Sequence, residues 1–302
     1  MVSSFGKKSQ KKESELSFSL YLKGFLMGLC DLVPGISGGT IAFITGIYER
    51  LVRAVHNISP VNVYEFFLAF FSRDWKKCKE ILQSRFDIFF LLILFAGIGT
   101  AIFTGAKVVE YLLLTYEEYV LTFFVGLILA SSKAIYDETG RQHNKVNLSF
   151  FAFGFVLGLL LLFLSPSQGA SVSLLYVFLG GFLAISAMFL PGISGSFILL
   201  IMGLYETVLS AVNHVASEYV ILLAFALGAV CGVFVISRVI TWLFEHYRFQ
   251  TLYLLLGLVL GCIFIPLSSI VRDFVFSVGS VLLLLFLVLL GMGSVFAVKK
   301  FA

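Results

Sequence analysis

A short phrase of proline, glycine and serine occurs twice in this otherwise apolar chain. Residues 34–38 read Pro-Gly-Ile-Ser-Gly, and residues 191–195 repeat the same five amino acids. Proline and glycine interrupt a helix, and a serine placed just before the next helix caps its free N–H groups. The N-terminus of a helix carries a partial positive charge and binds anions, phosphate among them. The two phrases therefore predict two broken segments whose tips bind an anion.

The backbone N–H groups and hydroxyls of these phrases are the expected ligands of a phosphate group. They belong to Gly35, Ser37, Gly38, Gly39 and Thr40 in the first phrase, and to Gly192, Ser194, Gly195 and Ser196 in the second. Lys107 and Arg238 join them because they lie at equivalent places in two apolar segments, where charges are costly and usually functional. Two alternatives stay open. The small residues could pack helices together, and the two cations could reach the membrane interface.

Four carboxylates are candidates for exchanging a proton in step with anion binding, because a half-buried carboxylate can take up and release a proton. They are Asp31, Glu49, Glu110 and Glu206. Met188 is the counterpart of Asp31, so this carboxylate is an asymmetric feature, and Glu110 could instead pair with Lys107. The four cysteines lack metal-ligand spacing. We expect no catalytic residue, metal or cofactor, and leave open a coupling ion, either a proton or sodium.

The composition places these residues in a membrane. The chain has 302 residues, of which 60% are hydrophobic and only 13% are charged, whereas a soluble domain carries about 25% charged residues. Apolar runs such as 150–163 and 281–298 approach the ~20 residues that span a bilayer. The sequence therefore predicts an all-α polytopic membrane protein. In such a protein the net charge of +4 says little about nucleic acid, and we expect no nucleic-acid partner.

The chain consists of two related halves. Residues 34–49 and 191–206 are identical at ten of sixteen positions, and weaker matches continue further on, at a spacing of 131 instead of 157. We therefore expect a tail at 1–17, a first repeat at 18–164 and a second repeat at 173–298. The first repeat holds 26 extra residues around 59–84, with aromatic and basic side chains that suit a helix on the membrane surface. A solvated loop is the alternative.

The basic residues predict how the chain crosses the membrane. If each phrase dips into the membrane and returns, 18 of the 21 lysines and arginines lie on one side, as the positive-inside rule demands of the cytoplasm. Each repeat then holds one re-entrant helical hairpin and three transmembrane helices, and the second repeat is inverted. The expected spans are 86–114, 118–136 and 148–164, then 218–244, 250–267 and 274–297. Both termini are expected to be cytoplasmic.

Each phrase is followed by a second short motif, Gly-Ile-Tyr-Glu at 46–49 and Gly-Leu-Tyr-Glu at 203–206. Together, the phrases and these motifs resemble the bacterial polyprenyl-phosphate transporter family. The likeness covers nearly the whole chain. It implies a flippase of the bacterial cytoplasmic membrane that recycles undecaprenyl phosphate, the carrier lipid of cell-wall peptidoglycan synthesis. The resemblance makes a polyprenyl-phosphate lipid and the bilayer the partners and leaves a homodimer open.

Two other functions remain as alternatives to lipid transport. One is an ion-coupled transporter of a small soluble anion. The other is an enzyme, because undecaprenyl-pyrophosphate phosphatases carry a similar phrase, PGxSRSG, in re-entrant hairpins. Gly38 and Gly195 stand where that phrase has a phosphate-binding arginine, and no ExxxE glutamate pair lies in an apolar segment. Without the arginine and a carboxylate base, hydrolysis lacks its chemistry, so we expect no enzyme.

Overall fold

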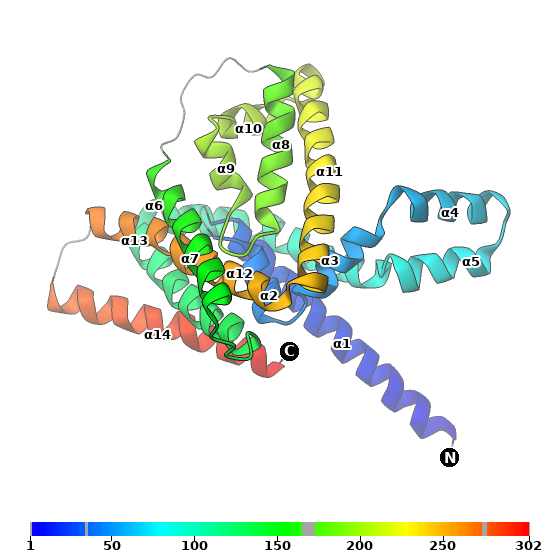
Figure 1. The fold of residues 1–302 in the computed structure, drawn as a ribbon, viewed down its shortest axis with the longest axis horizontal. Helices are drawn as coiled ribbons and strands as arrows, with labels where there is room; N and C mark the ends of the chain where they lie inside the picture. The colour runs from blue at the N-terminus through cyan, green and yellow to red at the C-terminus, as the bar shows by residue number, and fades with distance from the viewer. Residues whose placement is uncertain (1, 34–35, 165–172, 274–276, 302) are drawn as a thin grey trace.

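The structure is a computed structural model that describes residues 2–33, 36–164, 173–273 and 277–301. Every regular element in these ranges is a helix (Figure 1). The first half holds α1 (Val2–Asp31), α2 (Gly38–Ile44), α3 (Tyr48–Asn57), α4 (Pro60–Phe71), α5 (Trp75–Glu80), α6 (Ile88–Glu138) and α7 (Lys145–Leu160). The second half holds α8 (Leu174–Met188), α9 (Gly195–Ile201), α10 (Tyr205–Asn213), α11 (Val215–His246), α12 (Arg248–Cys262), α13 (Phe264–Asp273) and α14 (Val278–Phe301).

Several helices are long and apolar enough to cross a membrane, which confirms a multi-pass membrane protein. Within the described ranges they are 88–138, 145–163, 215–246, 248–272 and 278–297. The spans expected at 86–114 and 118–136 form the single helix α6, which breaks only at Tyr116 (φ −140°, ψ 40°). Tyr247, its counterpart 131 residues later, has nearly the same conformation (φ −137°, ψ 45°) and separates α11 from α12. In both halves, one expected span therefore ends and the next begins close to the tyrosine at which the helix is interrupted.

The first phrase folds into an antiparallel helical hairpin, in which α2 returns along α1. At the tip, Asp31 Oδ1 accepts a hydrogen bond from the Gly38 N–H at 2.7 Å. At the open end, Lys23 Nζ donates to the Thr45 carbonyl oxygen at 3.2 Å. Gly46 then takes φ 69°, a left-handed conformation that glycine adopts without strain, and turns the chain into α3.

The second phrase builds the same hairpin from α8 and α9. Tyr176 Oη donates to the Met202 carbonyl oxygen at 2.9 Å, and Met202 is the counterpart of Thr45. Gly203 takes φ 66° at the turn into α10, as Gly46 does in the first half. Figure 1 shows α9 lying beside α8, with α10 and α11 close by.

Glycines let one pair of helices in each half touch through their backbones. A Cβ on Gly97 of α6 would overlap the carbonyl oxygen of Tyr21 in α1, and a Cβ on Gly228 of α11 would overlap that of Phe178 in α8. Tyr21 and Phe178 are counterparts, as are the two glycines. In α1, Gly24 meets Leu94, and Gly28, one turn further on, meets Ile98. The contacts advance together along both helices, so α1 runs parallel to the first part of α6.

A second kind of glycine crossing joins the two halves. Gly126, in the second part of α6, lies on the backbone of Val288 in α14, and its counterpart Gly257 in α12 lies on Phe151 in α7. Gly158 extends the second crossing toward Cys262. Each half therefore packs its last long helix against the other half. Buried side chains of α2, α3, α6 and α12 form the core between these pairs, and α4 and α5 project away from it (Figure 1).

Candidate functional site

The tips of the two hairpins meet inside the protein. The Gly192 N–H donates to Thr40 Oγ1 at 3.0 Å, and both residues are buried. Tyr48 Oη donates to the Phe189 carbonyl oxygen at 2.7 Å, which ties the start of α3 to the second phrase. A Cβ on Gly39 would lie 2.9 Å from the Met188 carbonyl oxygen, so the tips touch closely there as well. Two segments that lie about 150 positions apart in the sequence thus form one centre.

The first tip already carries its own anion. The Asp31 carboxylate accepts from the Gly38 N–H, and Ser37 Oγ accepts from the Gly39 N–H at 3.2 Å. A carboxylate at this place satisfies the same free N–H groups that a phosphate would use. Thr40 lies one position further along, bonded across to the second hairpin. Gly35, expected among the ligands, lies outside the described residues.

The second tip lacks such an anion. Ser194 is the N-cap residue of α9, but its Oγ pairs with Ser196 Oγ at 2.7 Å and not with a backbone N–H of the helix. Met188 stands in the place of Asp31 and packs its side chain against Gly195. The two tips therefore share a shape but differ in charge, and the N–H groups of Gly195 and Ser196 have no side-chain acceptor at the N-cap.

Lys107 and Arg238 lie on the outer surface of their helices. Both are exposed, whereas the hairpin tips are buried, so the structure does not place these cations against the tips. Arg238 Nη1 contacts the Phe234 carbonyl oxygen of its own helix at 3.5 Å. The buried positions nearby, Gly105 and Ser237, face inward, and one or two residues further on a helix points elsewhere. The position of each cation around its helix, relative to these buried residues, is the signal that would have predicted an outward-facing side chain.

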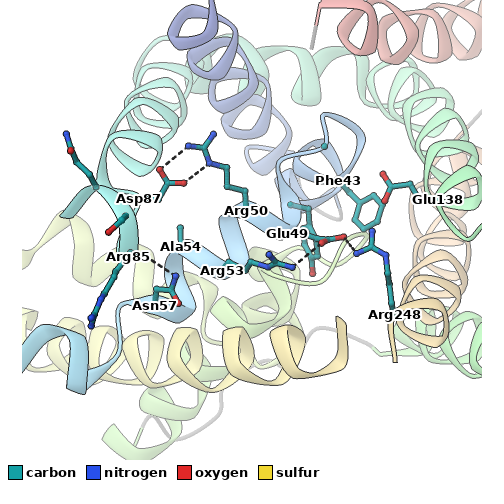
Figure 2. A pocket seen from close by; sticks show the side chains of 14 residues that line it. Phe43, Glu49, Arg50, Arg53, Ala54, Asn57, Arg85, Asp87, Glu138 and Arg248 are labelled. Carbon is teal, nitrogen blue, oxygen red and sulfur yellow. Dashed lines mark hydrogen bonds and ion pairs between the residues drawn. The ribbon is translucent and has the colours of Figure 1, made fainter. Parts of the chain in front are cut away.

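A polar pocket of about 640 Å³ lies at the open end of the first hairpin, where α2 turns into α3 (Figure 2). Four arginines line it: Arg50, Arg53, Arg85 and Arg248. We used these residues to orient the chain in the membrane and missed them as a site. The available signal was that Arg50 directly follows Tyr48 and Glu49, and that Arg53 lies three residues further on, one helical turn from Glu49.

Carboxylates divide these arginines into two groups. Arg50 makes a two-pronged pair with Asp87, at 2.6 and 3.0 Å, and Arg85 pairs with Glu65 at 2.8 Å. Glu49 instead bridges the other two: its Oε1 lies 2.7 Å from Arg248 Nη1, and its Oε2 lies 3.8 Å from Arg53 Nη2 (Figure 2). One carboxylate therefore serves two cations.

The other carboxylates of interest are placed differently. Glu110 and Glu206 are both exposed on their helices. Asp31 and Glu49, in contrast, hold defined partners at the tip and at the open end of the first hairpin. Of the four candidate carboxylates, Asp31 and Glu49 are thus the two that contact defined partners at the ends of the first hairpin.

An apolar pocket of about 190 Å³ lies on the opposite side of the same turn. Ile44 and Thr45 line it, together with residues of α1, α6 and α14 such as Leu26, Phe123 and Val295. Phe43 and Gly46, their neighbours in the chain, line the polar pocket. The end of α2 therefore separates a charged cavity from a hydrocarbon-lined one.

These features define a multi-pass helical membrane protein with two hairpins that meet in its core and a charged pocket beside one of them. Residues 27–275 match the model of the undecaprenyl phosphate translocase-like family, and the chain belongs to this family. The resemblance predicted from the repeated phrase is thereby confirmed. The family is one of transporters and not of enzymes, so the phosphatase alternative falls away.

Two relatives carry the same name, polyprenyl-phosphate transporter. The protein from Vibrio cholerae is 40% identical over 258 residues, which cover 80% of this chain and 75% of the relative. The protein from Staphylococcus aureus is 29% identical over 257 residues, which cover 80% of this chain and 83% of the relative. No solved structure matches the chain.

Proposed function

We propose that this protein moves a polyprenyl phosphate, undecaprenyl phosphate in particular, between the leaflets of a bacterial cytoplasmic membrane. The observation that carries the proposal is the meeting of the two hairpin tips through Thr40 and Gly192. In a bilayer, broken helices are tolerated only inside protein or beside a polar cavity. Two such breaks in one buried centre suit the passage of a phosphate group, while a hydrocarbon tail stays in the lipid.

The proposed topology has two inverted repeats, each with one re-entrant hairpin. Since α1 runs parallel to the first part of α6, the chain must return between them to the side where α1 begins. The same holds for α8 and α11, where Gly228 meets Phe178 and Gly232 meets Phe182. Helices α7 and α12 also run parallel. These directions agree with a second hairpin that enters from the opposite side, and the basic residues favour a cytoplasmic location for α1, α3 and both termini.

Within this scheme the phosphate is held by the N–H groups and hydroxyls of the tips. The second tip is the more open to an anion, because Ser194 and Ser196 bond each other and no carboxylate caps α9. At the first tip, Asp31 competes with a phosphate for the Gly38 N–H. Protonation of Asp31 would remove that competition, which makes it our preferred candidate for coupling to protons.

Reconstitution into liposomes tests the proposal. Leaflet exchange of a polyprenyl phosphate and release of inorganic phosphate are measured together, and we expect exchange without release. The double variant Ser37→Leu, Ser194→Leu should block exchange, because leucine fills both tips. Ser149→Leu, at an exposed position of α7, is the matched control. Movement of inorganic phosphate without the lipid would favour a small-anion transporter instead.

The extra segment of the first repeat is proposed to lie on the membrane surface. Helix α4 exposes Tyr64, Phe67 and Phe71, and Trp75 at the start of α5 is 62% exposed. Basic residues follow at once along the chain: Arg73, Lys76, Lys77 and Lys79. An aromatic face beside lysines and arginines suits the boundary between lipid tails and anionic headgroups.

A further inference from the structure

None of the four arginines of the polar pocket has a cationic counterpart at the equivalent position of the other repeat. At the spacings that relate the two halves, Arg50 corresponds to Thr207, Arg53 to Ser210, Arg85 to Ala216 and Arg248 to Glu117. Two of the three carboxylates that line the pocket are kept: Glu49 corresponds to Glu206, and Asp87 to Glu218, whereas Glu138 corresponds to Ser269. Tyr116 and Tyr247, which precede these two residues, have matching conformations, and this supports treating Glu117 and Arg248 as equivalent positions. The positive charge of the pocket is therefore not repeated at the equivalent place of the other repeat.

We propose that this pocket binds the phosphate headgroup of the lipid, and that Glu49 is an internal counter-anion which the headgroup displaces from Arg53 and Arg248. The proposal rests on the proposed function, because it assigns a station to the same phosphate. The chemistry recognised is that of a phosphate monoester, which carries up to two negative charges and accepts paired hydrogen bonds from arginine.

The ion pairs show which arginines are available. Arg50 is held by both oxygens of Asp87 and lies 4.3 Å above the ring of Phe90, so its position is fixed. Arg53 and Arg248 both pair with Glu49, at 3.8 and 2.7 Å, and Glu138 is a further carboxylate in the lining of the pocket. A doubly charged anion in place of Glu49 would offer one negative charge to each of these two arginines.

The neighbouring apolar pocket indicates that the anion is attached to a hydrocarbon. It lies across the turn at residues 43–46, only one turn of helix from the charged cavity. This proximity suits a molecule with a phosphate at one end, bound in the charged cavity, and an isoprenoid chain at the other, packed on the apolar side of the turn. Free phosphate would gain nothing from the apolar one, so a prenyl phosphate should bind more tightly than inorganic phosphate.

Titration calorimetry on the full-length protein in detergent tests the assignment with three probes: farnesyl phosphate, inorganic phosphate and farnesol. We expect Arg53→Gln and Arg248→Gln each to weaken farnesyl phosphate binding about tenfold or more, the size of one lost charge-assisted contact. Farnesol binding should not change. Arg248→Lys should restore part of the loss, because it keeps the charge. Arg272→Gln, at an exposed arginine of α13, is the matched control.

Glu49→Gln separates a displaced counter-anion from a structural one. Removing the competing charge should tighten farnesyl phosphate binding, whereas a loss as large as that of Arg248→Gln would overturn the role given to Glu49. Equal affinity for farnesyl phosphate and inorganic phosphate would overturn the assignment to a lipid headgroup. Unchanged binding in both arginine variants would overturn the site itself.

Leaflet exchange by the native protein, measured in parallel, keeps the two proposals apart. If exchange occurs but does not depend on these arginines and neither does probe binding, the pocket assignment fails and the proposed function stands. If the arginines govern probe binding but no lipid is exchanged, the proposed function fails and the pocket remains an anion site.

Discussion

Replacing Thr40 with valine would isolate the contact that joins the two hairpins. Valine has nearly the same shape as threonine, so packing at this 1% exposed position is preserved. Only the hydroxyl is lost, and with it the acceptor of the Gly192 N–H. The substitution therefore asks what the meeting of the tips contributes to stability and transport.

The expected cost follows from burial of the donor. The Gly192 N–H would remain inside the protein without its partner, and a buried unpaired donor costs about 1–3 kcal/mol. This corresponds to a shift of about 5- to 150-fold between the joined and separated tips. Thr122→Val is the control, because Thr122 is also buried but its hydroxyl bonds the Glu118 carbonyl of its own helix at 2.6 Å. That carbonyl keeps its helical partner, so the control should cost less.

Two measurements check the prediction. Unfolding in mixed detergent micelles gives the change in unfolding free energy, and leaflet exchange in liposomes gives the change in transport. Thr40→Val should lose more stability than Thr122→Val and should exchange polyprenyl phosphate at an altered rate. Equal stability losses and native exchange in both variants would refute the view that the contact between the tips matters.

Three further predictions concern other parts of the chain. Gly228→Ala should lower the unfolding free energy by about 1–3 kcal/mol through overpacking, whereas Gly99→Ala, where a Cβ meets open space, should not; equal losses would contradict the close crossing. Lys107→Gln and Arg238→Gln should each slow leaflet exchange if the cations serve the phosphate, and unchanged exchange would leave them as interfacial residues. If α4 and α5 lie on the membrane, brominated lipids should quench the fluorescence of Trp75, which is identified as the part of the signal that the variant Trp75→Phe loses. A Trp75 signal that brominated lipids do not quench would indicate a solvated loop.

Local chemistry predicted the breaks well. Helices end at Asp31 and Met188 and restart at Gly38 and Gly195, as Pro-Gly followed by Ser requires. The change of span near Tyr116 was also within reach, because apolar runs are interrupted there. These features depend on neighbours in the chain, which a sequence displays directly.

The arrangement of charges was less accessible. Asp31 caps a helix seven residues away, and this depends on how the hairpin closes. The pocket needs α3, the start of α6 and the start of α12 to come together, so Arg248 reaches Glu49 across about 200 residues. The side chains of Lys107 and Arg238 depend on helical phase, which equivalence between repeats does not reveal. Contacts between residues far apart in the chain, and the direction in which a helix turns its side chains, therefore could not be predicted from the sequence.

The exchange of long helices between the halves has a consequence for biosynthesis. Helix α7 leaves the ribosome about 100 residues before α12, the partner on which its glycines pack, and the second part of α6 must wait for α14, the last helix to be made. The first half cannot complete its contacts while it is being translated, whereas the last helices of the second half find their partners already made. The glycine face of α7 is covered once α12 is made and that of α6 only when α14 is made, so a chain that stops before α14 would leave the face of α6 uncovered.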